Sequence, residues 1–336
     1  MNAAVHGAPI LELRNVSKRF VKKLDVAGLV AQKLGSRIRE EVVHAVDGVD
    51  LAIEDGEVVG LVGESGCGKS TLGRIVAGVH EASSGSVLYR GIDVATRTGA
   101  DKRDAALKIQ MIFQDPMSSL NPRLRVRDIV GEAPRFHGIV SAARMDSYVQ
   151  DLLLKVGLEP EFVRRYPHQF SGGQRQRIGI ARALAVKPDF LVCDEAVAAL
   201  DVSIQAQVLN LFMTLREELN LTYLFISHDL GVVEHLSDRV VIMYLGRVVE
   251  IAPTDELFAT PNHPYTKALL DEMPRLDSRR RKFVPVKGEI PSPLDPPSGC
   301  HFNPRCPHAT ARCRDERPVL REIGPGRLSA CHLNDQ

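Results

Sequence analysis

The chain has 336 residues, of which 44% are hydrophobic and 25% charged, and its formal net charge is +1. These are ordinary globular values, sufficient for one large core with an appendage. The near-neutral charge gives no indication that nucleic acid is the main partner, and no apolar run is long enough to span a bilayer. Residues 1–7 lack the basic and apolar regions of a secretory signal, so we expect the chain to stay in the cytosol.

The N-terminal part of the chain is expected to consist of short strands. Residues 10–20 begin with alternating apolar and polar side chains and predict a strand. Residues 21–41 are basic and weakly patterned, and we interpret them as an exposed insertion. A second strand pair is expected around residues 45–53, followed by a turn at 54–56 and a short apolar run at 57–62 that predicts a buried strand.

Directly after that run, the sequence matches the phosphate-binding loop G-x-x-x-x-G-K-[ST], and residues 72–78 predict the first turns of a helix. Glycines let consecutive backbone N–H groups turn inward around a phosphate chain, and the helix N-terminus adds its positive dipole end. Lys69 is expected to reach the β- and γ-phosphates, and the Ser70 hydroxyl to bind Mg²⁺. The phosphate-loop pattern should arise by chance in only about one chain in a hundred of this length. This argues against the alternative, a glycine-rich turn with a stray lysine. The residues expected to contact nucleotide are Gly63, Ser65, Gly66, Cys67, Gly68, Lys69, Ser70 and Thr71.

The middle of the chain combines further strands with a long helical stretch. Strands are expected at 86–89 and 109–113. From 115 to about 187 the apolar residues take helical spacing. Two continuous apolar runs, at 190–193 and 222–226, are typical of buried parallel strands.

The last third of the chain changes character near residue 262. Residues 239–251 predict a hairpin whose turn is Leu245-Gly246. From residue 261 onward proline becomes frequent and the helical and strand periods fade, so we place a domain boundary near residue 262.

Three more motifs bring polar groups to the ends of these elements. Residues 170–177 read Phe-Ser-Gly-Gly-Gln-Arg-Gln-Arg, and Ser-Gly-Gly before a helix suits an anion, with an ordinary N-capped loop as the alternative. About twenty residues later an apolar strand ends in Asp194 and Glu195. We expect Asp194 to hold Mg²⁺ through water and Glu195 to orient or deprotonate an attacking water. Ser-His-Asp at 227–229 closes another apolar strand.

With Gln114, which follows the strand at 109–113, these motifs number five, and in their order along the chain they resemble those of the ATP-binding subunits of ABC transporters over roughly residues 10–260. The resemblance implies an α/β P-loop NTPase of the ABC type. Its parts are a RecA-like mixed sheet core, an antiparallel β part and a helical signature subdomain at about 115–187. We therefore expect an ABC ATPase domain at 8–262 and a small Cys-rich C-terminal extension at 263–336.

Several residues take their expected roles from this resemblance. Gln114 corresponds to the Q-loop glutamine, which senses Mg²⁺ and the attacking water and couples to the membrane subunits. Asp201 corresponds to the D-loop residue at the dimer contact, and His228 to the switch histidine that touches the γ-phosphate. Phe20 is the candidate for stacking on adenine, with a core phenylalanine at a strand end as the alternative. In the family, two nucleotide domains face head to tail around two ATP molecules, and each signature motif completes the opposite site: here Ser171, Gly172, Gly173 and Gln174.

Two positions depart from the family pattern, because Ala196 stands where proline is usual and Ala198 where serine is usual. Both are expected at the dimer contact and not in the chemistry. The set as a whole predicts a site that hydrolyses ATP. Its members are Lys69, Gln114, Glu195 and His228 for catalysis, and Ser70, Gln114 and Asp194 for Mg²⁺.

Three stretches, at 113–122, 201–207 and 263–267, resemble the branch of dipeptide, oligopeptide and nickel importers. Within it, residues 170–177 resemble the F-type of two paired ATPase subunits. The resemblance implies a paralogous D-type subunit as partner, or a second copy of this chain. It also implies two transmembrane permeases and an extracytoplasmic solute-binding protein, with this chain peripheral on the cytoplasmic face of the inner membrane and no nucleic acid.

The implied function is ATP hydrolysis that energises uptake of di- or oligopeptides, with nickel or a metal chelate as the alternative solute. One rival is a non-transport ABC protein acting on nucleic acid or ribosomes. Such proteins usually carry two nucleotide domains or a long coiled coil, and this chain has one domain. A second rival is a nucleotide-binding module that senses redox state through its tail.

Four of the six cysteines lie in the last forty residues, at Cys300, Cys306, Cys313 and Cys331. A reducing cytosol argues against two disulfides. Four thiolates suit tetrahedral zinc or a [4Fe–4S] cluster, and the gaps between these cysteines are wider than in a usual zinc knuckle. The spacing resembles the tail of this importer branch, in which some members hold an iron–sulfur cluster. It therefore favours [4Fe–4S] over zinc or bare thiols.

Two other features receive no function. Cys67 occupies a variable position of the phosphate loop, and Cys193 is interpreted as a strand-core thiol. The basic run at 279–282 is interpreted as a solvated face, with contact to anionic lipid as the alternative.

Overall fold

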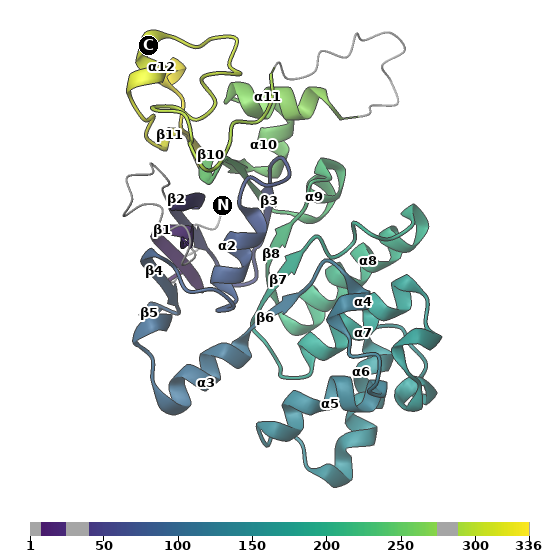
Figure 1. Cartoon of the computed structure of the whole chain (residues 1–336). Helices are drawn as coiled ribbons and strands as arrows, with labels where there is room; N and C mark the ends of the chain where they lie inside the picture. Colours follow the sequence, from purple (N-terminus) through teal and green to yellow (C-terminus); the bar gives the residue numbers. More distant parts are fainter. Residues whose placement is uncertain (1–7, 25–39, 274–287, 336) are drawn as a thin grey trace.

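The computed structural model describes residues 8–24, 40–273 and 288–335 (Figure 1). The centre of this part of the chain is an eight-stranded sheet with the strand order β11-β12-β10-β9-β3-β8-β7-β6. Every side chain of β3, β7 and β8 is buried, as expected for parallel strands that are covered on both faces. The parallel strands are β3 (Val58–Val62), β6 (Ile109–Ile112), β7 (Phe190–Asp194), β8 (Thr222–Ile226) and β9 (Arg239–Tyr244).

Antiparallel strands extend this sheet at one edge: β10 (Arg247–Pro253), β12 (Arg327–Ser329) and β11 (Arg321–Gly324). The hairpin predicted around Leu245-Gly246 is confirmed, and these two turn residues have φ values of 41° and 82°. β12 pairs with β10 through Glu250–Ser329 and Ile251–Leu328. Residues on both sides of position 262 therefore share one sheet.

A second, antiparallel sheet has the strand order β2-β1-β4-β5. Its strands are β1 (Leu11–Lys22), β2 (Glu41–Ile53), β4 (Ser84–Tyr89) and β5 (Ile92–Asp93). The strand pair expected at 45–53 is one long strand, β2, which pairs with β1 as far as Lys22 and Glu41. The insertion expected at 21–41 was therefore placed too widely, because backbone pairing does not require an apolar pattern. Residues 25–39 and the basic run at 279–282 lie outside the described part.

Helix α2 (Lys69–Val76) starts where the loop after β3 ends, and it contacts β7, β8 and β2. The stretch expected to be helical from 115 to about 187 contains α4 (Pro116–Ser119), α5 (Val126–Phe136), α6 (Met145–Lys155) and α7 (Gly172–Leu184). These helices gather on one side of the molecule (Figure 1). The other helices are α3 (Gly99–Lys108), α8 (Val202–Leu219), α9 (Leu230–Leu236), α10 (Thr254–Ala259), α11 (Pro264–Asp271) and α12 (Ala311–Asp315). Short 3₁₀ turns lie at Val94–Thr96, Ala142–Arg144, Pro160–Arg164, Pro167–Gln169 and His332–Asp335.

Three apolar clusters hold these layers together in the described part of the chain. One packs the helical stretch and α8 against β7 and β8, and a second fills the space between the two sheets around α2. The third lies under β9 and β10 and joins Tyr244, Tyr265 and Phe302. The C-terminal extension, by which we mean described residues 263–273 and 288–335, is thus packed on the hairpin of the central sheet. No helix within the described ranges is long and apolar enough to cross a membrane.

Candidate functional site

The loop between β3 and α2 is shaped by the absence of side chains at its glycines. Gly66 and Gly68 have φ values of 80° and 107°, which side-chain-bearing residues rarely adopt. A Cβ on Gly68 would lie 2.1 Å from the carbonyl oxygen of Ala45 in β2. The backbone therefore passes too close to β2 for any larger residue at position 68.

Lys69 is the first residue of α2 and is only 4% exposed. Its ammonium donates hydrogen bonds to the carbonyl oxygens of Gly63, at 2.7 Å, and Glu64, at 3.0 Å. Its third contact is with Cys67 Sγ at 3.9 Å, so the partners found among the described residues are uncharged groups of its own loop, and a buried ammonium in such surroundings suits an anionic ligand. The contact of Lys69 with phosphate stays a prediction.

Ser70 and Asp194 meet although they come from different elements. The Ser70 hydroxyl donates to Asp194 Oδ1 at 2.7 Å, and Asp194 is 2% exposed at the end of β7. Burial raises the pKa of Asp194, and the hydrogen bond from Ser70 acts in the opposite direction. A hydroxyl and a carboxylate oxygen are the hard donors that Mg²⁺ takes, so these residues fit the predicted metal site.

Three further predicted residues meet around one carboxylate. Gln114 Nε2 donates to Glu195 Oε2 at 2.6 Å, and His228 Nδ1 lies 3.3 Å from Glu195 Oε1. Glu195 has a φ of 48° and its N–H donates to the carbonyl of Ile226 at 3.0 Å. Backbone strain of this kind persists where the surroundings hold it, often at catalytic positions. The structure thus places the amide of Gln114 on Glu195, whereas the predicted Mg²⁺ set joined Gln114 to Ser70 and Asp194.

The strand order explains why these residues lie close together. Lys69 follows β3, Gln114 follows β6, Glu195 follows β7 and His228 follows β8, and these four strands are parallel neighbours. The carboxyl ends of parallel strands meet at one edge of a sheet, which is where ligands bind in such folds. Sequence positions far apart are therefore brought to one place.

The signature residues, 171–174, lie at the start of α7 and not at this sheet edge. Ser171 caps α7: its hydroxyl accepts from the N–H of Gln174 at 3.3 Å, and Gln174 Oε1 accepts from the N–H of Ser171 at 3.1 Å. Ser171, Gly172 and Asp201 are exposed. In the described part of the chain, no hydrogen bond joins Ser171 to the phosphate loop. This end of α7 is thus free to face another molecule.

Gly173 has a local reason to be glycine, because a Cβ there would lie 2.4 Å from Cγ2 of Ile204 on α8. A side chain at this position would push α7 and α8 apart. The glycine thus permits the close packing that presents the N-terminus of α7.

Phe20 lies near the end of β1 and is 39% exposed. Its ring makes an edge-to-face contact with His80, with ring centroids 5.7 Å apart, and Lys18 Nζ lies 5.2 Å from its centroid. It belongs to none of the three apolar clusters of the described residues. An exposed ring suits stacking better than the core role that was its alternative.

The four cysteines of the extension line one cavity of about 20 Å³, together with His263, His308 and His332. Burial raises the pKa of the Cys300 thiol to about 11 and also raises the pKa of the Cys306 and Cys331 thiols. All four are free thiols. No three His, Cys, Asp or Glu side chains within the described ranges are arranged to hold one metal ion.

Sequence reasoning missed two partners of the phosphate loop. Arg305 binds the Glu64 carboxylate through both of its terminal nitrogens, at 2.7 and 2.9 Å. The Tyr265 hydroxyl accepts the N–H of Glu64 at 2.9 Å. These partners are 241 and 201 residues away along the chain, and no local signal links them to Glu64.

Two family models match the chain. The model described as "ABC transporter" matches residues 46–198, and "Oligopeptide/dipeptide transporter, C-terminal region" matches residues 249–313. The oligopeptide transport ATP-binding protein AppF of Bacillus subtilis is 48% identical over 334 residues, covering 98% of this chain and 99% of the relative. The chain belongs to the ABC transporter ATP-binding proteins.

Other relatives agree. The dipeptide transport ATP-binding protein DppF of Haemophilus influenzae is 49% identical over 300 residues, covering 89% of this chain and 92% of the relative. A solved dimeric structure of the ATP-binding cassette MJ0796, described as a post-hydrolysis state with ADP and Pi, superposes with a TM-score of 0.61. It has 28% identity and covers 73% of this chain and 98% of that one. The predicted ABC ATPase, its P-loop fold and its mixed and antiparallel sheets are confirmed.

Proposed function

We propose that this ABC ATPase drives peptide import, acting at the cytoplasmic face of the cell membrane. The observation that carries the proposal is the meeting of Lys69, Asp194 and Glu195 at one sheet edge. This site belongs to a chain similar along its length to oligopeptide and dipeptide transport ATP-binding proteins. The chain also carries the C-terminal region typical of those transporters.

In the proposed reaction, water attacks the γ-phosphate of ATP in line with the departing ADP. Bound Mg²⁺ would neutralise charge on the phosphates, and Ser70 and Asp194 are the residues that would hold it. Lys69 binds the phosphate oxygens with its buried ammonium. Glu195 accepts a hydrogen bond from Gln114 at the sheet edge and orients or deprotonates the water, while His228 lies beside it to contact the γ-phosphate.

The exposed signature residues support a site completed by a second subunit. Ser171 and Asp201 are exposed on the helical side of the molecule, and the hydrogen bonds of Ser171 in the described chain are local ones. We propose that they close over the ATP of an opposing ATPase subunit, a D-type paralogue or a second copy of this chain. Closure would pull on two permeases, which receive solute from an extracytoplasmic binding protein.

The test is transport by the whole complex. The permeases, the solute-binding protein and the ATPase subunits are reconstituted in vesicles, and ATP-driven uptake of a labelled tripeptide is measured with wild-type chain and with Lys69→Ala. We expect uptake with wild type only. Uptake of ⁶³Ni²⁺ without peptide uptake would favour the metal alternative, and co-purification with ribosomes in place of permeases would overturn the transport role.

We further propose that the four tail cysteines hold a [4Fe–4S] cluster. Support comes from the four thiols that line one cavity, a soft donor set that such clusters take. The described side chains are not pre-arranged around one ion, and this holds for zinc and for a cluster alike. When bound, the group would cross-link a tail with little core of its own. Anaerobically purified protein should be brown with broad visible absorption, and a colourless preparation with stoichiometric zinc would reverse the assignment.

A further inference from the structure

The phosphate loop contains an acidic residue that its motif does not require. Glu64 occupies a free position of the pattern, directly after Gly63, and its side chain is 19% exposed. Its carbonyl oxygen accepts from the Lys69 ammonium, so it belongs to the same turn that would hold phosphate. A carboxylate beside a polyphosphate repels it unless another group neutralises the charge.

Arg305 supplies that charge from the C-terminal extension. Its two terminal nitrogens bind the two oxygens of Glu64 at 2.7 and 2.9 Å, which is the paired geometry that only arginine forms with a carboxylate. The Arg305 side chain is 5% exposed, and its Nε is buried without a hydrogen-bond partner among the described residues. Such burial is costly unless the ion pair with Glu64 offsets it.

The position of Arg305 is fixed by aromatic packing. Tyr244 lies under its guanidinium, with the ring centroid 5.8 Å away. The rings of Tyr244, Tyr265 and Phe302 contact each other with centroids 4.6 to 5.4 Å apart. Tyr265 also accepts the N–H of Glu64 at 2.9 Å. Two residues from the extension thus hold one residue of the phosphate loop.

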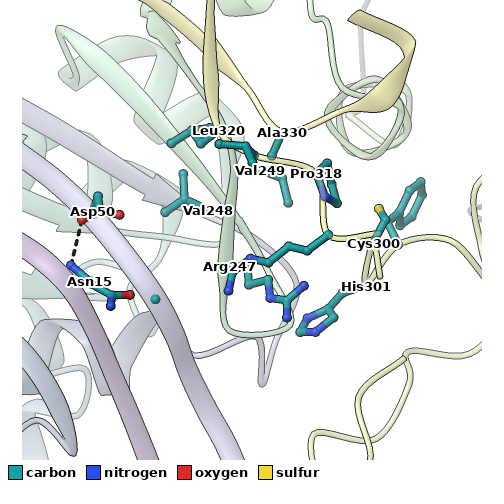
Figure 2. Close-up of a pocket in the computed structure, with 14 residues that line it drawn as sticks. Asn15, Asp50, Arg247, Val248, Val249, Cys300, His301, Pro318, Leu320 and Ala330 are labelled. Atoms are coloured by element: carbon teal, nitrogen blue, oxygen red, sulfur yellow. Dashed lines mark hydrogen bonds between the residues drawn. The ribbon is translucent and has the colours of Figure 1, made fainter. Parts of the chain in front are cut away.

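The extension also holds the turn of the β9–β10 hairpin, which lies beside the phosphate loop, through hydrogen bonds. His301 Nδ1 lies 2.8 Å from the carbonyl oxygen of Leu245, and Arg247 donates to the carbonyl of Gly299 at 2.9 Å. Gly246 in turn donates its N–H to the carbonyl of Cys67 in the phosphate loop at 2.8 Å. Figure 2 shows Arg247 and His301 lining the pocket of about 290 Å³ between the strands and the extension. The extension therefore reaches the loop by two routes.

We infer that the C-terminal extension is part of the ATP site, in which Arg305 neutralises Glu64 and, together with Tyr265, positions the phosphate loop for nucleotide. The inference rests on the ATP site proposed above. Arg305 is a positioning residue, because it acts on the nucleotide through Glu64. Loss of Arg305 should therefore weaken binding of both ADP and ATP.

The experiment measures Kd for MgADP and MgATP by equilibrium binding to the full chain. We expect Arg305→Ala to raise both Kd values about tenfold at low salt, because the Glu64 charge is left uncompensated. The increase in Kd caused by Arg305→Ala should be smaller at 0.5 M salt, since salt screens that repulsion. Arg305→Lys keeps the charge without the paired geometry and should raise Kd about threefold.

A double variant shows whether weaker binding in Arg305→Ala comes from the uncompensated charge of Glu64 or from a folding defect. Glu64→Gln in the Arg305→Ala background removes both charges and should return Kd to within about twofold of wild type. Arg312→Ala is the matched control, because Arg312 pairs with Glu316 in the same extension, and its Kd should be unchanged. Wild-type Kd in both Arg305→Ala and Arg305→Lys, or a double variant as weak as the single one, overturns the inference. Failure of wild-type protein to bind nucleotide would instead overturn the proposed ATP site.

Discussion

The central parallel sheet and the C-terminal extension are built by different means. In β3, β7 and β8 every side chain is buried, so the edge that carries the catalytic residues is fixed by a continuous apolar core. β11 and β12 of the extension are short and mostly half-exposed. The extension is attached through the pairing of β12 with β10, through the apolar cluster around Phe302 and Tyr265, and through Arg305. A single substitution should therefore loosen the extension, whereas chemistry at the sheet edge should respond only to the residues located there.

The largest effect is expected at the sheet edge. Glu195→Gln keeps the size of the side chain but removes the carboxylate that orients or deprotonates water, so kcat for ATP hydrolysis should fall about 10³-fold with ATP still bound. Steady-state hydrolysis and equilibrium binding check this. Glu217→Gln, on the exposed side of α8, is the control and should leave both values unchanged. A 10³-fold fall in kcat in Arg305→Ala as well would contradict the division between the two regions.

The next effect concerns the attachment of the extension. Phe302 is 1% exposed and contacts both Tyr244 and Tyr265. Phe302→Ala should cost about 3 kcal/mol of docking free energy, since a large buried ring is replaced by a cavity. Arg305 should then become exposed, and limited trypsin digestion should cut after it early while the sheet core stays intact. Phe136→Ala, at a ring that is 83% exposed, should give the wild-type digestion pattern. A wild-type pattern in Phe302→Ala would show that this ring does not hold the extension.

The same division explains what could be predicted from the sequence. The loop before α2, the strand that ends in Asp194 and the hairpin at Leu245-Gly246 are each encoded within about ten neighbouring residues. Their meeting at one edge follows from the rule for parallel strands. The reach of Arg305 to Glu64 has no such code, because an isolated arginine 241 residues away resembles any other surface charge until the chain is folded.

The predictions that fell short also concern features that depend on the folded chain and not on neighbouring residues. The insertion expected at 21–41 was too wide, because polar residues such as Lys22 and Glu41 pair through their backbones. The four tail cysteines line one cavity, but no three candidate ligands within the described ranges are arranged for one metal ion. Their sequence spacing could not say whether the side chains are arranged for one ion, since that depends on how the turns between them pack.

The smallest expected effect concerns Phe20, and it distinguishes a contact with the adenine base from charge neutralisation at the phosphates. Phe20→Ala should weaken ATP binding about fivefold, because stacking on a base contributes about 1 kcal/mol or more, whereas Phe20→Tyr should retain affinity. The loss should be the same at 0.05 M and 0.5 M salt, since stacking involves no net charge. The loss in Arg305→Ala should instead decrease at high salt. Equilibrium binding at both salt concentrations distinguishes an aromatic contact with the base from charge neutralisation at the phosphates. Two variants with the same salt dependence would show that Phe20 and Arg305 both act only through the overall stability of the loop region.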